Sequence, residues 1–138
     1  MAAFNSTLTR LNGVYEKDLS AHYNLIAETE SLIFFTGKPD NYSSHSPSGA
    51  NTGINNTLNP NASTKYDLGH LIDKQGANGA AQLNVLCGGS KASGWTAHNV
   101  PEGSTFDIDY VAHEMGHQMG AGHTYTMYSS QSDRTVEP

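Results

Sequence analysis

The sequence predicts an α/β fold of the α+β type, in which a small sheet packs against two helices. Apolar residues recur at helical spacing from Phe4 to Leu19, which predicts an amphipathic helix. Three short apolar stretches between residues 66 and 100, separated by glycine-containing turns, are typical of strands. A second helical pattern ends near Met119. At 138 residues the chain is long enough for one domain with a moderate core, so we expect residues 1–138 to form a single domain.

The first helix is expected at residues 4–19, where the regularly spaced apolar side chains are Phe4, Leu8, Leu11, Tyr15 and Leu19. The next segment, Tyr23–Phe35, is rich in Leu, Ile and Phe and is expected to form a strand or a hairpin. Residues 36–64 are a polar tract of Asn, Ser, Thr, Pro and Gly. Such a composition predicts loop, apart from a short helical turn near Ile54–Leu58.

Three strands are expected next, at Tyr66–Asp73, Ala80–Cys87 and Ser93–Val100. The glycines within residues 76–79 and 88–94 supply the turns between them. Cys87 is the only cysteine, so no disulfide can form within the sequence. We expect it to be a small buried residue, and the alternative is a cysteine whose partner lies in sequence outside this chain.

The most informative stretch begins at His113 and reads His-Glu-Met-Gly-His-Gln-Met-Gly-Ala-Gly-His. Residues four apart on a helix project from one face, so His113 and His117 can each place a nitrogen ~2.0–2.1 Å from one zinc ion. Glu114 can hold a water on that ion, which is the arrangement that metal-assisted hydrolysis requires. Gly120 is expected to take a left-handed conformation, end the helix and turn the chain so that His123 becomes the third ligand. Three histidines leave one position for water, which is typical of a catalytic zinc site.

The opposite face of this helix is apolar, and its members are Ile108, Val111, Ala112, Met115 and Met119. Ser104 or Asp107 is expected to cap the start of the helix, since the two residues have the spacing of a capping box. The alternative is an ordinary amphipathic helix with surface histidines. The glycine and the third histidine at the required offsets make that alternative much weaker.

The extended motif HExxHxxGxxH resembles the zinc signature of the metzincin metalloendopeptidases. The flanking residues Phe106–Ala112 and His123–Tyr125 resemble the reprolysin-like (adamalysin/ADAM-type) branch, especially its bacterial members. Two earlier segments, Tyr66–His70 and Cys87–Ala92, are also similar to that branch. The resemblance covers most of the chain, and the zinc motif is its most specific part.

This resemblance implies a zinc-dependent metalloendopeptidase with one catalytic Zn²⁺. The ligands would be His113, His117 and His123, and Glu114 would be the general base for a zinc-activated water. The implied fold is a twisted mixed sheet with an antiparallel edge strand, packed on an amphipathic helix and the zinc-binding helix. In metzincins the strand corresponding to Ala80–Cys87 is that edge, and substrate pairs with it as an extra strand. The implied backbone contacts to substrate are Gln82, Leu83, Asn84 and Val85.

The chain departs from the family pattern at both ends. Family members have a strand before the first helix, and here the predicted helix starts too close to Met1 to leave room for it. They also carry a methionine in a turn below the zinc, whereas Met127 lies only four residues beyond His123. We therefore expect a partial domain cut at both ends, and Met127 as the Met-turn remains the alternative.

The content of charged residues and the net charge indicate which classes of binding partner to expect. Charged residues make up 14% and the net charge is −6, which does not favour nucleic acid, so the expected partners are protein or peptide substrates. The longest apolar run, Leu32–Phe35, is too short to cross a membrane, and no signal peptide is visible. We expect secretion as part of a longer precursor, and the alternative is a cytosolic protein. The oligomeric state stays open. The rival function is a zinc-binding but inactive fragment or pseudoenzyme that acts as a binding module.

The four histidines outside the motif are expected to be surface or hydrogen-bonded residues: His22, His45, His70 and His98.

Overall fold

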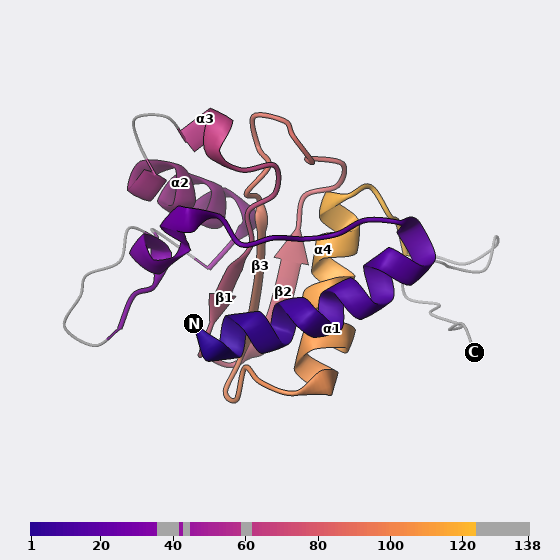
Figure 1. Ribbon diagram of the computed structural model, residues 1–138. Coiled ribbons are helices and arrows are strands. Elements are labelled where there is room, and N and C mark those ends of the chain that lie inside the picture. Colours follow the sequence, from indigo (N-terminus) through magenta and orange to yellow (C-terminus); the bar gives the residue numbers. More distant parts are fainter. Residues whose placement is uncertain (36–41, 43–44, 59–61, 124–138) are drawn as a thin grey trace.

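The computed structural model describes residues 1–35, 42, 45–58 and 62–123 (Figure 1). Its centre is a three-stranded sheet formed by β1 (Leu71–Asp73), β2 (Ala77–Ala81) and β3 (Gly94–His98). The order is β1-β3-β2, with β1 parallel to β3 and β2 antiparallel to it. The predicted α/β fold, with a mixed sheet and an antiparallel edge strand, is confirmed.

Helices pack on both faces of this sheet, and the contacts of β3 residues identify which helix lies on which face. In chain order they are α1 (Ala2–Leu19), the 3-10 helix η1 (Ala27–Leu32), α2 (Pro47–Leu58), α3 (Ala62–Lys65), the π-helix η2 (Phe106–Ala112) and α4 (His113–Gln118). Alternate residues of a strand face opposite sides. Trp95 and Ala97 pack with Ala50 of α2 on one side. On the other side Gly94 lies against Gln118 of α4. The helix that carries the histidine motif therefore lies on the face of the sheet opposite to α2.

Helix α1 was predicted correctly and begins two residues earlier than expected. Its buried residues Leu11 and Tyr15 share one core cluster with Phe106, Val111 and Met115 of the motif-bearing helix. The apolar stripes of the two helices thus pack against each other, and α1 lies across η2 and α4 in Figure 1.

The expected cap at the start of the motif-bearing helix is wrong. Asp107 is fully buried inside η2, and its carboxylate accepts hydrogen bonds from Thr7 and Arg10 of α1. A buried carboxylate needs such partners, because desolvation without them is costly. Asp107 therefore ties the start of this helix to α1 instead of capping it.

The expected strand or hairpin at Tyr23–Phe35 is also wrong, because this segment contains η1. The hydroxyls of Thr29 and Ser31 donate to the carbonyls of Ile26 and Glu28, both at 2.7 Å. Hydrogen bonds of this kind to a carbonyl three residues earlier favour a turn over a ladder.

Helix α2 replaces most of the loop expected in the polar tract, of which only Ile54–Leu58 was predicted to be helical. Ser46 accepts a hydrogen bond from the Gly49 N–H at 3.1 Å, and Pro47 is the first helical residue. Both are recognised start signals of helices. Residues 36–41, 43–44 and 59–61 of this tract lie outside the described residues.

The three strands are shorter than expected, and the largest difference follows β2. This strand ends at Ala81, so most of Ala80–Cys87 is irregular, with positive φ at Asn84 (55°) and Cys87 (58°). Cys87 is exposed, contrary to the expectation of burial. Among the described residues, no helix combines the length and the apolar character that crossing a membrane requires.

Candidate metal centre

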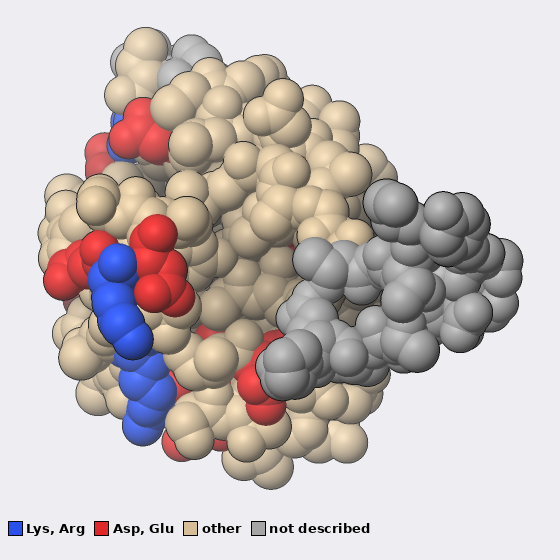
Figure 2. Space-filling view, turned by 90° about the vertical axis from the view of Figure 1, so that its right-hand side faces the viewer, with Lys and Arg blue, Asp and Glu red and all other residues tan. Residues whose placement is uncertain are grey.

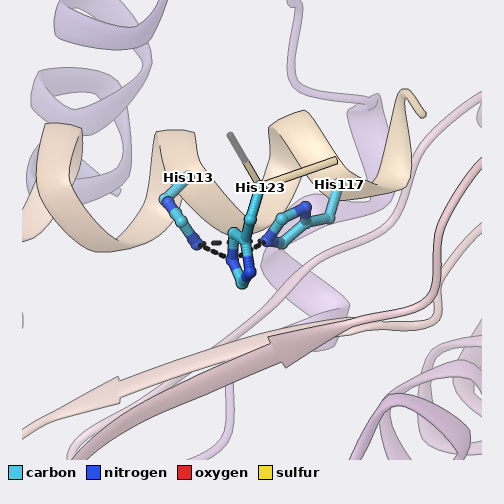
Figure 3. A group of neighbouring side chains, drawn as sticks. All are labelled: His113, His117 and His123. Carbon is cyan, nitrogen blue, oxygen red and sulfur yellow. Dashed lines mark hydrogen bonds between the residues drawn. The ribbon is translucent and has the colours of Figure 1, made fainter. Parts of the chain in front are cut away.

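Three histidine side chains converge beside α4 (Figure 3). His113 and His117 project from the helix, and His123 comes from the segment that follows it. The Nε2 atom of His113 is 3.1 Å from that of His117 and 3.0 Å from that of His123, and the third separation is 2.9 Å. The predicted meeting of these three residues is confirmed. Within the described ranges, they are the one group of His, Cys, Asp or Glu with metal-ligand spacing.

A helix-terminating turn brings His123 back to the helix. Gly120 has φ +106°, its N–H bonds to the His117 carbonyl at 2.8 Å, and the Ala121 N–H bonds to the Gly116 carbonyl at 2.9 Å. These two bonds form a Schellman motif, in which a glycine just past the helix satisfies the last carbonyls. The predicted role of Gly120 in reversing the chain is confirmed.

The donor set fits a zinc ion. The Nδ1–H of His117 donates to the Ala121 carbonyl at 2.6 Å, which leaves the Nε2 lone pair of that ring directed at the other two histidines. Nitrogen ligands at 2.0–2.1 Å in a tetrahedral site are roughly 3.3–3.4 Å apart, close to the observed separations. Burial, together with repulsion from His117 and His123, lowers the pKa of His113 and favours the neutral form that binds metal.

Glu114 lies beside this centre, at the first turn of α4, and is partly buried against strand β2. Burial raises the pKa of its carboxyl group, while the neighbouring His117 acts in the opposite direction. A carboxyl group with a raised pKa is better suited to accept and return a proton near neutral pH than an ordinary exposed one.

Side chains of α1 and of the segment after it bond to the motif-bearing helix on the side away from the three histidines. The Tyr15 hydroxyl donates to the Ala112 carbonyl at 2.7 Å, at the junction between η2 and α4. The Tyr23 hydroxyl donates to the sulfur of Met119, next to the terminating glycine. The π-helical geometry of η2 is common near functional sites, because it shifts the residues that follow around the axis. Sequence analysis identified Tyr15 only as a helix-face residue and missed these contacts.

A buried polar network fixes the other end of α4. Gln118 has no exposed surface; its amide donates to the carbonyls of Gly69 (2.8 Å) and Lys91 (3.3 Å), and its Oε1 accepts from His70 Nδ1 (2.7 Å). The remaining ring nitrogen of His70 accepts from the Thr96 hydroxyl at 2.7 Å. Burial lowers the pKa of His70 to about 4, so the ring is neutral at neutral pH.

The expected substrate-contacting residues do not lie on the edge strand. Gln82, Leu83, Asn84 and Val85 follow the end of β2, and three of their N–H groups are already bonded. Gln82 donates to the Ser93 carbonyl, Asn84 to that of His117 and Val85 to that of Gln118. Their placement on a strand is wrong because this segment folds against the end of α4; contact with substrate stays a prediction.

The four other histidines are hydrogen-bonded or paired, as expected. His22 contacts Glu16, His45 pairs with Asp73 at 2.7 Å, and His98 bonds to Val100. The alternative Met-turn residue, Met127, lies outside the described residues.

Comparison with known proteins agrees with this centre. A family model described as metallo-peptidase family M12B, reprolysin-like, matches residues 1–137. Comparisons with curated proteins and with solved structures gave no match. Metallopeptidases of this family use zinc, and the three converging histidines are close enough to hold it. The chain belongs to the M12B reprolysin-like metallopeptidase family.

Proposed function

We propose that this protein is a zinc-dependent endopeptidase in which Glu114 is the general base. The observation that carries the proposal is the convergence of three histidine Nε2 atoms, each within 3.1 Å of the others. The residue that follows His113, Glu114, places a partly buried carboxyl group beside them. Three neutral nitrogen ligands leave a coordination position for water, whereas structural zinc sites usually have four protein ligands.

Each residue of the centre has a separate task in this mechanism. His113, His117 and His123 hold the zinc ion, which when bound would polarise a water molecule and the scissile carbonyl. Glu114 accepts the proton of the attacking water and returns it to the leaving amine, so it acts first as a base and then as an acid. Ala121 keeps His117 in the ligating tautomer, because its carbonyl accepts the Nδ1 proton.

The substrate class is proteins and peptides, bound in an extended conformation along β2. In the described part of the chain, β2 pairs with β3 on one side only, so its other edge can pair with an added strand. Figure 2 shows a largely uncharged face with its lysines and arginines at one edge beside acidic residues, which does not favour nucleic acid. Family members are often extracellular, and we propose secretion for this protein as well.

Hydrolysis of a quenched fluorescent peptide, with zinc content measured in parallel, tests the proposal. A chelator should abolish hydrolysis and added zinc should restore it. Glu114→Gln should keep one zinc per chain and lose at least about 100-fold in kcat, the usual contribution of a general base. Glu102→Gln, at an exposed position before the helix, is the matched control and should behave like the parent. Full zinc content with no hydrolysis by the parent would instead support a zinc-binding module.

A further inference from the structure

Strand β2 lies beside α4, and the Glu114 side chain lies next to one residue of this strand, Gly79. A Cβ atom built on Gly79 would lie 2.9 Å from both Cγ and Oε1 of Glu114, and 3.2 Å from its carboxyl carbon. Non-bonded carbon atoms are attracted to each other at about 3.5–4.0 Å, so these distances are repulsive. The Glu114 carboxyl group therefore occupies the space that any other side chain at position 79 would fill.

The backbone itself does not require glycine at this position. Gly76, Gly103 and Gly120 have positive φ angles, which L-residues rarely adopt, but Gly79 does not. It lies inside a regular strand, paired with Thr96 of β3, where glycine normally weakens a sheet. The contact with Glu114 is thus the feature of the structure that accounts for glycine here.

The direction of the missing side chain separates this contact from substrate pairing. Alternate residues of β2 face opposite sides of the sheet, and Gly79 is on the side of α4. A side chain at position 79 would therefore point toward the metal centre. It would not project along the free edge, where the backbone would pair with an extended peptide.

We propose that Gly79 is a positioning residue, whose absent side chain forms the notch that seats the Glu114 carboxyl group beside the metal centre. This inference rests on the proposed function. Alanine at position 79 would force the carboxyl group to move by roughly 0.5–1 Å to regain normal contact distances. Misplacement of about 1 Å in an active site can cost about 100-fold in rate. Gly79→Ala should accordingly lower kcat by about 10–100-fold, change KM by less than about threefold, and leave zinc content unchanged.

Two measurements test the inference, and the control is Gly89→Ala. Gly89 has no neighbour within 4 Å of its added Cβ and no positive φ. This control variant should therefore match the parent both in its kinetic constants and in its unfolding midpoint. The first measurement is the kcat and KM of the zinc-loaded protein. A loss confined to KM would mean that the methyl group blocks substrate, and an unchanged kcat would mean that Glu114 needs no notch; either result overturns the proposal.

The second measurement does not depend on activity. Urea unfolding of the full chain is compared for the parent, Gly79→Ala, Glu114→Ala and the double variant. Gly79→Ala should lower the unfolding midpoint in the parent background and leave it unchanged or raise it when Glu114 is alanine, because the clash is then removed. An equal effect in both backgrounds would overturn the inference. If the parent hydrolyses no peptide, the proposed function fails. The unfolding comparison of these four proteins then decides by itself whether Gly79 seats Glu114.

Discussion

Replacement of Gln118 by leucine should destabilise the protein far more than its conservative size suggests. The substitution removes the amide that bonds to Gly69, Lys91 and His70, in a position with no solvent exposure. The Lys91 carbonyl keeps another donor, the Gly69 N–H at 2.9 Å. The Gly69 carbonyl and the His70 N–H each lose the partner that Gln118 supplies. A buried polar group left without a partner costs about 1–3 kcal/mol, so the expected loss is about 2–6 kcal/mol in the free energy of unfolding. Typical domains have only about 5–15 kcal/mol in total.

Urea unfolding followed by circular dichroism measures this loss. Gln82→Leu is the matched control, because Gln82 is exposed, and it should change the free energy of unfolding by less than about 0.5 kcal/mol. If Gln118→Leu and Gln82→Leu had the same small effect, the buried hydrogen bonds would not be the source of stability at this end of α4.

Three further predictions concern the metal centre and its surroundings. His123→Ala should lose more than about 100-fold in zinc affinity, since loss of a supporting hydrogen bond alone can cost 10–100-fold; equilibrium dialysis showing parental affinity would contradict the three-ligand geometry. Gly120→Ala should lose roughly 1–2 kcal/mol of stability because its φ is +106°, whereas Gly122→Ala, with open space around its Cβ, should lose little; equal unfolding midpoints for the two would refute the role of the turn. The pKa of His70 falls from 6.5 to about 4 on folding, because burial favours the neutral ring. The contribution of the neutral ring to the free energy of unfolding is therefore fully present above about pH 6.5. It is lost as the pH falls to 4, by roughly 3 kcal/mol in all. His70→Gln should flatten the dependence of the unfolding midpoint on pH in that window, and an unchanged slope would contradict the assignment.

The metal centre could be predicted because its geometry is local in sequence. His113 and His117 are one helical turn apart, and Gly120 lies where a helix-ending residue must be for His123 to return. Helical periodicity and the conformational freedom of glycine are enough to bring the three rings together. No long-range contact had to be known.

The surroundings of the centre could not be predicted in the same way, since they depend on contacts between distant segments. The notch at Gly79 faces a residue 35 positions later, and no spacing rule connects the two. From nearby residues alone, Asp107 was interpreted as a helix cap. In the structure its carboxylate is instead bonded to two residues of α1. One signal was present for Gln118: at about 140° from His113 around the helix, it borders the apolar stripe, where a polar residue needs a buried partner.

The elements between α1 and β1 were mispredicted for a related reason. Ile26 and Leu32 have the apolar character of strand residues, but in the structure they pack beside Ile54 and Leu58 of α2. A short apolar run does not distinguish a strand from a turn of helix. For α2, the pair Ser46-Pro47 was a start signal that the polar composition of the tract outweighed in the sequence analysis.

The hydrogen bonds between α1 and the motif-bearing helix have a consequence for biosynthesis. Thr7 and Asp107 are 100 residues apart, and Tyr15 and Ala112 are 97 apart. At about 5–20 residues per second, a ribosome makes α1 roughly 5–20 s before its partner emerges. During that interval the apolar face of α1 has no helix to cover it, so the nascent chain is exposed to aggregation and is a natural client of chaperones.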